Sequence, residues 1–411
     1  MRGEKPNPAK FSNDINFSIF YKFAESQSLS AICCMALDSA GLLDEKYMSP
    51  ELIKMWTDAR DKAIRKNILL DFKRDEICAF MEEKRIWYMP LKGVILCTLY
   101  PHPGMRQMSD NDILFDMNGR EKVHMFFMDA GFECKSYNRG NHDVYMMEPI
   151  YNYEMHVSLF SDGSGKALYE YYKNIKAKLI KDDNNDYGYH FTHEDFYLYF
   201  LTHAYKHHSG GGTGFRTLLD EYVYMNHYKD TLDWDYVRTE LEKLEISEFE
   251  RDLRHLAGKL FGYDADRNYM LGDEEIQEAK RAKDSKDGKI SNNYSATKNS
   301  GGAKFSRKLT LNEKHMLANM LTLGTYGNVS NWTISKLKGF QTEKGLIGKL
   351  IAKIKYLKAR LYPSSSTFKE AFPFFYKYKI FLPLLPLYRF GRSMIKNRTN
   401  VVAEIKEYFK Y

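Results

Sequence analysis

Residues 91–116, LKGVILCTLYPHPGMRQMSDNDILFD, contain the pattern around which the fold of this chain can be worked out. The stretch predicts a short helix, a turn rich in proline and glycine, and a strand that carries Asp110 and Asp112. Side chains two residues apart on a strand point to the same face, so both carboxylates project together. Two such carboxylates repel each other, and a hard divalent cation such as Mg²⁺, which prefers oxygen ligands, stabilises the arrangement.

Three residues near this aspartate pair are suited to binding phosphate. The segment at 85–91, RIWYMPL, predicts a short strand that leads into Lys92 and Gly93 at the start of the helix. Gly93 would let a phosphate approach the backbone N–H groups, and Lys92 adds a positive charge, although a plain turn is the alternative. Arg106 has a guanidinium that matches phosphate oxygens. Arg106 would otherwise pair with one of the two aspartates, and both interpretations stay open.

A third carboxylate lies further along the chain. Residues 151–159, YNYEMHVSL, predict a strand in which alternation places Glu154 and His156 on the polar face. Glu154 is therefore the candidate to join the aspartate pair, with His156 beside it. A surface-exposed pair is the alternative for these two residues.

Two later helices carry further polar candidates. Residues 194–208, EDFYLYFLTHAYKHH, predict an amphipathic helix with His203 and His207 one turn apart. Such a pair can bind zinc, but the absence of a third ligand nearby favours packed or substrate-facing histidines. On the next predicted helix, Arg216 and Asp220 would either pair with each other or orient a group in the active site.

The composition indicates the cellular compartment and argues against a secreted or a membrane-spanning protein. The 411 residues include five cysteines without a CxxC pair or zinc-ligand spacing, which favours free thiols in a reducing cytoplasm. The first residues contain no apolar segment typical of a signal peptide, and no apolar run is long enough to span a bilayer. We expect a cytoplasmic protein.

The net charge of +7 is unevenly distributed. Residues 331–411 contain 17 Lys/Arg and 4 Asp/Glu, or +13, which leaves −6 for the rest of the chain. Within this region a helix with an apolar stripe and a lysine-rich face is predicted; the stripe consists of Ile347, Leu350, Ile351, Ile354 and Leu357. We expect the stripe to dock on the catalytic core. Weak contact of residues 345–390 with an anionic surface such as a membrane is the alternative.

These patterns divide the chain into five parts. Ser49-Pro50-Glu51 is a strong helix start within the first part, and SKDGKISNNYSATKNSGG is typical of a linker. The predicted parts are a helical N-terminal region (1–84), an α/β core (85–190), a helical region packed on that core (191–284), a flexible linker (285–303) and a basic helical C-terminal region (304–411).

The motifs in their order resemble one known family. LKG at 91–93, YPxPGxR at 100–106, SDxDILF at 109–115 and ExH at 154–156 are similar to the uncharacterised nucleotidyltransferase family of bacteria, within the nucleotidyltransferase-fold superfamily. Further downstream, THAYKH, FR, LD and LDW between residues 202 and 234 extend the resemblance. It covers roughly residues 60–260.

The resemblance implies an α+β fold with a mixed β-sheet flanked by helices, and transfer of a nucleoside monophosphate from an NTP to an acceptor hydroxyl with release of pyrophosphate. It implies Mg²⁺ or Mn²⁺ held by Asp110, Asp112 and Glu154, which also serve catalysis. Phosphates would be bound by Lys92, Gly93 and Arg106, and substrate positioned by His156, His203, His207, Arg216 and Asp220.

Three questions stay open at this point. The acceptor would be a small molecule or sugar, an RNA end or a protein side chain. The sequence departs from the superfamily's usual Gly-Gly or Gly-Ser by having Lys92-Gly93-Val94, which leaves the phosphate contacts open. The alternative function is a catalytically silent nucleotide sensor or assembly protein that uses the same pocket.

Overall fold

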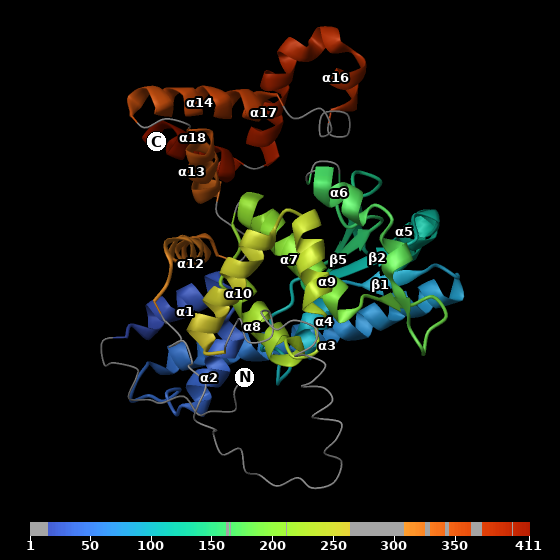
Figure 1. Cartoon of the computed structure of the whole chain (residues 1–411), viewed down its shortest axis with the longest axis vertical. Helices are drawn as coiled ribbons and strands as arrows, with labels where there is room; N and C mark the ends of the chain where they lie inside the picture. The colour runs from blue at the N-terminus through green and yellow to red at the C-terminus, as the bar shows by residue number, and fades with distance from the viewer. Residues whose placement is uncertain are drawn as a thin grey trace.

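The computed structural model describes residues 15–161, 164, 166–210, 212–263, 308–324, 329–341, 345–362, 372–396 and 398–411. Its centre is a five-stranded mixed sheet with the strand order β1-β2-β5-β4-β3 (Figure 1). The strands are β1 (Tyr88–Pro90), β2 (Asn111–Phe115), β3 (Glu133–Ser136), β4 (His142–Met147) and β5 (Tyr151–His156). The central pair β2 and β5 is parallel, and the other pairs are antiparallel. The predicted α+β class with a mixed sheet is confirmed.

One face of the sheet is largely apolar, although it also carries the buried polar side chains of Asn111 and Asp143. It packs against α3 (Pro50–Glu83) and α5 (Arg120–Asp129). Helix α3 begins where the sequence predicts, because the Ser49 side chain accepts a hydrogen bond from the Leu52 N–H at 3.3 Å. The buried core between sheet and helices includes Ile77, Ile113, Phe115, Phe127, Tyr145, Tyr153 and Met155.

The opposite face of the sheet carries the polar side chains. Strand alternation places Asp112 and Leu114 on this face, while Ile113 and Phe115 point to the apolar core. Helices α4 (Lys92–Thr98) and α7 (His193–Gly210) lie on this side, where Leu114 packs into the second large core cluster. The candidate site therefore lies between the sheet and these two helices.

Helices surround this centre. The elements before and after the sheet are α1 (Phe17–Ser26), α2 (Ser30–Ser39), α6 (Lys166–Tyr172), the small strands β6 (Ile180–Lys181) and β7 (Tyr189–His190), α8 (Arg216–Tyr228), α9 (Trp234–Lys243) and α10 (Ser247–Phe261), with 3₁₀ turns at Met117–Gly119 and Ile175–Lys178. Helix α12 (Leu311–Leu323) returns to this body, where Lys259 pairs with Glu313 at 2.6 Å. The predicted linker at 285–303 lies outside the described residues.

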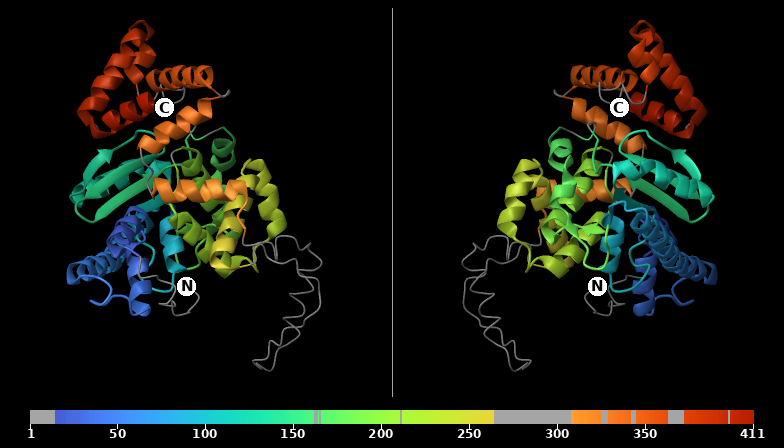
Figure 2. Two further views of the ribbon diagram at one scale, coloured as in Figure 1. Left: turned by 90° about the vertical axis from the view of Figure 1, so that its left-hand side faces the viewer. Right: turned by 90° about the vertical axis from the view of Figure 1, so that its right-hand side faces the viewer.

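The C-terminal helices gather at one end of the molecule (Figures 1 and 2). They are α13 (Val329–Phe340), α14 (Leu346–Leu361), α16 (Pro373–Lys377), the 3₁₀ helix η5 (Lys379–Leu384), α17 (Leu385–Lys396) and α18 (Arg398–Lys410). Helix α14 packs on α13 and α17 and buries Ala352 and Tyr356, whereas Ile347, Leu350 and Ile354 are exposed. The expected docking of this apolar stripe on the catalytic core is wrong, because the helix buries a different face. No helix in the described part of the chain has the length and hydrophobicity needed to cross a membrane.

Candidate functional site

Two carboxylates and one imidazole meet on the polar face of the sheet. Asp112 of β2 stands opposite Glu154 of β5 in the parallel ladder. His156 follows on the same face, and its Nε2 lies 3.2 Å from Asp112 Oδ1 and 3.7 Å from Glu154 Oε2. One potential ligand atom from each of the three residues lies within 4.8 Å of the others. This donor set fits a divalent cation, with carboxylates suited to Mg²⁺ or Mn²⁺ and the imidazole typical of transition-metal sites.

Asp110 lies immediately before β2 and lines the same cavity as Glu154 and His156, which has a volume of about 360 Å³. It does not belong to the close group that Asp112, Glu154 and His156 form. Of the predicted metal set, Asp110 and Glu154 therefore line one cavity, while Asp112 lies close to Glu154 and His156.

The charges of this group depend on one another. Burial alone would raise the pKa of Asp112, but Lys92 and His156 outweigh it and hold that pKa well below its usual range. For Glu154 and Asp110, burial and the neighbouring Asp112 charge raise the pKa. The surroundings thus favour the charged form of Asp112, whereas burial and the Asp112 charge make the charged forms of Asp110 and Glu154 less favourable than in free side chains.

Lys92 connects the acidic group to helix α7. Its Nζ lies 3.3 Å from Asp112 Oδ2 and 2.7 Å from His203 Nε2, and His207 Nε2 is 3.2 Å from the same His203 atom. Burial and the Lys92 charge keep the pKa of His203 well below its ordinary value. A neutral His203 accepts a hydrogen bond from Lys92 and holds its ammonium beside Asp112. Both histidines line the cavity, as the substrate-facing interpretation requires.

Arg106 does not pair with either aspartate of the strand. Its Nε and Nη2 donate to Asp220 Oδ1 and Oδ2 at 2.8 and 3.1 Å, and the side chain is only 6% exposed. Tyr100 donates to the same Asp220 carboxylate at 2.8 Å. The alternative in which Arg106 pairs with Asp110 or Asp112 is therefore corrected, since a residue distant in sequence supplies the counter-charge. Its guanidinium is already occupied, which weakens the predicted role as a phosphate clamp.

Gly93 has a packing role in the structure. A Cβ added there would lie 2.9 Å from Met108 Cε, and Arg106 Nη1 donates to the Gly93 carbonyl at 3.3 Å. The absence of a side chain thus permits close approach of α4 to the following loop. Its contact with phosphate stays a prediction.

Arg216 reaches the same cavity from another element. It comes from the start of α8, lines the cavity, and its Nη1 donates to the Gln107 carbonyl at 2.9 Å. Arg106 and Tyr100 both bind Asp220, and Arg216 lines the cavity, so its role in orienting a group of the active site stays a prediction.

Two further cavity residues were missed. His142, at the start of β4, pairs across the strands with His156, and its Nε2 lies 3.9 Å from Glu154 Oε2. Burial, with His156 nearby, lowers the pKa of His142 to about 4. Lys206 lines the cavity beside His203 and His207, and burial and Lys92 lower its pKa. Lys206 is three residues after His203, so the sequence already indicated that both lie on one side of the helix. That His142 lies beside His156 follows only from the order of the strands.

The structure thus presents a mixed sheet that carries acidic side chains on neighbouring central strands. The chain belongs to a family described as uncharacterised nucleotidyltransferase, whose family model matches residues 13–262. No curated protein and no solved structure matches the chain.

Proposed function

We propose that this protein is a divalent-metal-dependent nucleotidyltransferase that transfers a nucleoside monophosphate from an NTP to an acceptor hydroxyl. The observation that carries the proposal is the register of Asp112 against Glu154 on parallel strands, with His156 completing a cation-binding group. Mg²⁺ or Mn²⁺ would be held by Asp112, Glu154 and His156, with Asp110 from the same cavity. When bound, the ion supplies charge neutralisation for the triphosphate and polarises the reacting oxygens.

The cationic side chains of the cavity account for recognition of the triphosphate. Lys92, Lys206 and Arg216 approach from α4, α7 and α8, and each lines the cavity that Glu154 also lines. A triphosphate carries several negative charges, and charge-assisted hydrogen bonds to these groups would orient it. His203 keeps Lys92 in position through the 2.7 Å contact.

The reaction forms a bond between the acceptor oxygen and the α-phosphorus and breaks the bond from that phosphorus to the pyrophosphate oxygen. Glu154 serves as metal ligand or takes the proton of the acceptor hydroxyl. Burial and Asp112 raise its pKa, which makes it a stronger base than a free glutamate. His156 positions the acceptor or the Glu154 carboxylate.

The test is label transfer from α-³²P-NTPs, supplied one base at a time with Mg²⁺ or Mn²⁺, to total RNA, to the protein itself or to a metabolite extract. Transfer that is lost in Asp110→Ala/Asp112→Ala supports the proposal. Metal-dependent NTP binding without transfer or pyrophosphate release would instead favour a silent sensor, and absence of NTP binding would reject this use of the pocket.

A further inference from the structure

The C-terminal helices expose large apolar side chains at an unusual density. Of the thirty large apolar side chains that are exposed among the described residues, eighteen lie between Ile347 and Phe409. Ile347, Leu350, Ile354 and Leu357 alternate at spacings of three and four on α14, which places them in one row along the helix. They are 71, 59, 58 and 40% exposed, so no described element covers the row.

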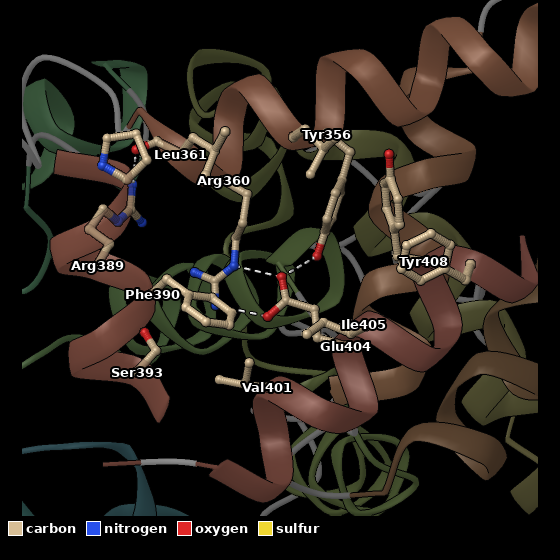
Figure 3. Close-up of a pocket in the computed structure, with 13 residues that line it drawn as sticks. Tyr356, Arg360, Leu361, Arg389, Phe390, Ser393, Val401, Glu404, Ile405 and Tyr408 are labelled. Carbon is tan, nitrogen blue, oxygen red and sulfur yellow. Dashed lines mark hydrogen bonds and ion pairs between the residues drawn. The ribbon is translucent and has the colours of Figure 1, made fainter. Parts of the chain in front are cut away.

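The row continues into an apolar cavity. Leu357 also lines a cavity of about 350 Å³ between α14, α17 and α18, shown in Figure 3. Phe390, Ile405 and Phe409 line the same cavity and are themselves exposed. The apolar surface therefore extends from α14 onto α17 and α18, and we call the row together with this cavity lining the α14–α18 face.

A partly buried ion pair joins the helices that carry this face. Arg360 Nε and Nη2 donate to Glu404 at 2.6 and 2.8 Å, and the Tyr356 hydroxyl donates to the same carboxylate at 2.6 Å (Figure 3). These bonds join α14 to α18 and give the Glu404 carboxylate its hydrogen-bond partners. Glu404 is one of the four acidic residues between 331 and 411. The exposed apolar side chains are thus carried by helices that are fixed to each other.

The surroundings of the face are strongly basic. Residues 331–411 carry a net charge of +13, and α14 itself has lysines at 349, 353, 355 and 358. Arg389 lines the cavity and donates to the Leu361 carbonyl at 3.1 Å, while the structure gives it no ion pair among the described residues. Lysine stems can lie along an apolar surface while their ammonium groups stay in water.

We propose that the α14–α18 face binds the surface of an anionic phospholipid membrane. Apolar side chains flanked by lysines and arginines favour burial at the boundary of head groups and acyl chains, with added attraction to anionic lipids. A second copy of the chain would bring two C-terminal regions together, each of net charge +13 over residues 331–411, and these regions repel each other. Nucleic acid would match the charge but leave the apolar row exposed to water.

The face lies outside residues 13–262, which the family model covers, so this proposal is independent of the proposed nucleotidyl transfer. It describes a partner surface and does not depend on the metal site. Its function would be to hold the rest of the chain, including residues 13–262, beside a membrane.

The test is co-sedimentation of the full chain with vesicles of phosphatidylcholine alone and vesicles that also contain about 30% phosphatidylglycerol. We expect binding to the anionic vesicles that weakens as salt rises but persists at moderate ionic strength, because the apolar contribution is not screened. Equal binding to both kinds of vesicle, or complete loss at modest salt, would overturn the proposal.

Two double variants distinguish binding through this face from non-specific binding through other exposed apolar side chains. Leu350→Glu with Ile354→Glu should lower the partition coefficient onto anionic vesicles by about tenfold or more. The matched control, Ile68→Glu with Phe72→Glu, changes side chains on α3 that are 57 and 64% exposed and should bind as the wild type does. Thermal unfolding of both variants monitors folding.

Unchanged vesicle binding by the α14 variant would overturn the proposal. The proposal would also be overturned if the protein binds no vesicles but forms a concentration-dependent dimer, measured by light scattering, that the α14 substitutions abolish. That second result would assign the face to contact between copies of the chain.

Discussion

Asp112 and Glu154 face each other across the parallel strands β2 and β5, at the point where His156 also reaches the Asp112 carboxylate at 3.2 Å. Side chains directly opposite each other on adjacent strands are close neighbours, so like charges there are unfavourable without a compensating group. In this structure Lys92 and His156 provide that compensation. A bound cation would do so more completely, and the predictions below follow from this balance of charge.

Removing the charge of either carboxylate should weaken cation binding and slow nucleotidyl transfer. Asp112→Asn and Glu154→Gln keep the size of each side chain but remove a negative ligand, so we expect activity to fall on the order of 10²–10³-fold. Mn²⁺ binding by titration calorimetry and label transfer provide the two measurements. Glu133→Gln changes an exposed strand carboxylate and should leave both intact. Normal Mn²⁺ binding by both site variants would exclude this metal site.

Lys206 should contribute to binding of the triphosphate and slightly oppose folding in its absence. Burial and the charge of Lys92 lower its pKa, so Lys206→Met should leave the thermal midpoint of the free protein unchanged or higher. Loss of a charge-assisted hydrogen bond should weaken NTP affinity about tenfold or more. Lys135→Met, on the exposed strand β3, is the control. Unaltered NTP affinity in Lys206→Met would remove this residue from the proposed site.

Arg106 should act mainly on stability. Arg106→Met leaves the buried Asp220 carboxylate without its bidentate partner, which should cost about 3–5 kcal/mol of unfolding free energy. Adding Asp220→Asn should restore much of this loss, because no buried charge then lacks a counter-charge. Urea unfolding of the two single variants and the double variant measures the coupling.

Arg216→Met is the matched comparison for Arg106, since it changes a cavity-lining arginine outside this pair. We expect it to lower NTP affinity with little change in stability. A stable Arg106→Met protein that loses only NTP binding would restore the phosphate-clamp role that the sequence predicted.

A buried carboxyl in α8 should make stability depend on pH. The Tyr197 hydroxyl lies 3.0 Å from both Glu221 Oε1 and Glu250 Oε1, and its single proton can serve only one of them. Burial and Glu250 raise the pKa of Glu221 to about 8 from 4.5. The unfolded chain therefore releases this proton first, so the contribution of Glu221 to stability is complete below about pH 4.5 and is lost as the pH rises towards about 8.

Glu221→Gln removes that titration. The difference in unfolding free energy between Glu221→Gln and the wild type should shift in favour of the variant as the pH is raised from about 5 to about 8. Urea unfolding at several pH values measures it, with Glu133→Gln as the exposed control. A difference that does not vary with pH would show that Glu221 is ionised in the folded protein throughout this range.

Local chemistry allowed several features to be predicted before the structure. The Ser49 cap, the helix after Lys92, the alternation of Glu154 and His156 and the order of motifs from 91 to 156 depend on neighbours a few residues apart. Backbone geometry imposes these spacings, so they are visible in the amino-acid order. The mixed sheet followed from the resemblance that the same motifs carry.

Tertiary structure alone decided which distant residues meet. Arg106 finds Asp220, which is 114 positions away, because α8 packs against the loop before β2. His142 reaches the acidic group because β4 lies beside β5, and the apolar row of α14 stays exposed because Ala352 and Tyr356 make its helical contacts instead. Strand order and helix packing depend on contacts summed over the whole chain, whereas periodicity reports only which face a residue occupies. The order of neighbouring residues thus determined which face of a helix or strand each side chain occupies. The three-dimensional packing determined which distant side chains it meets.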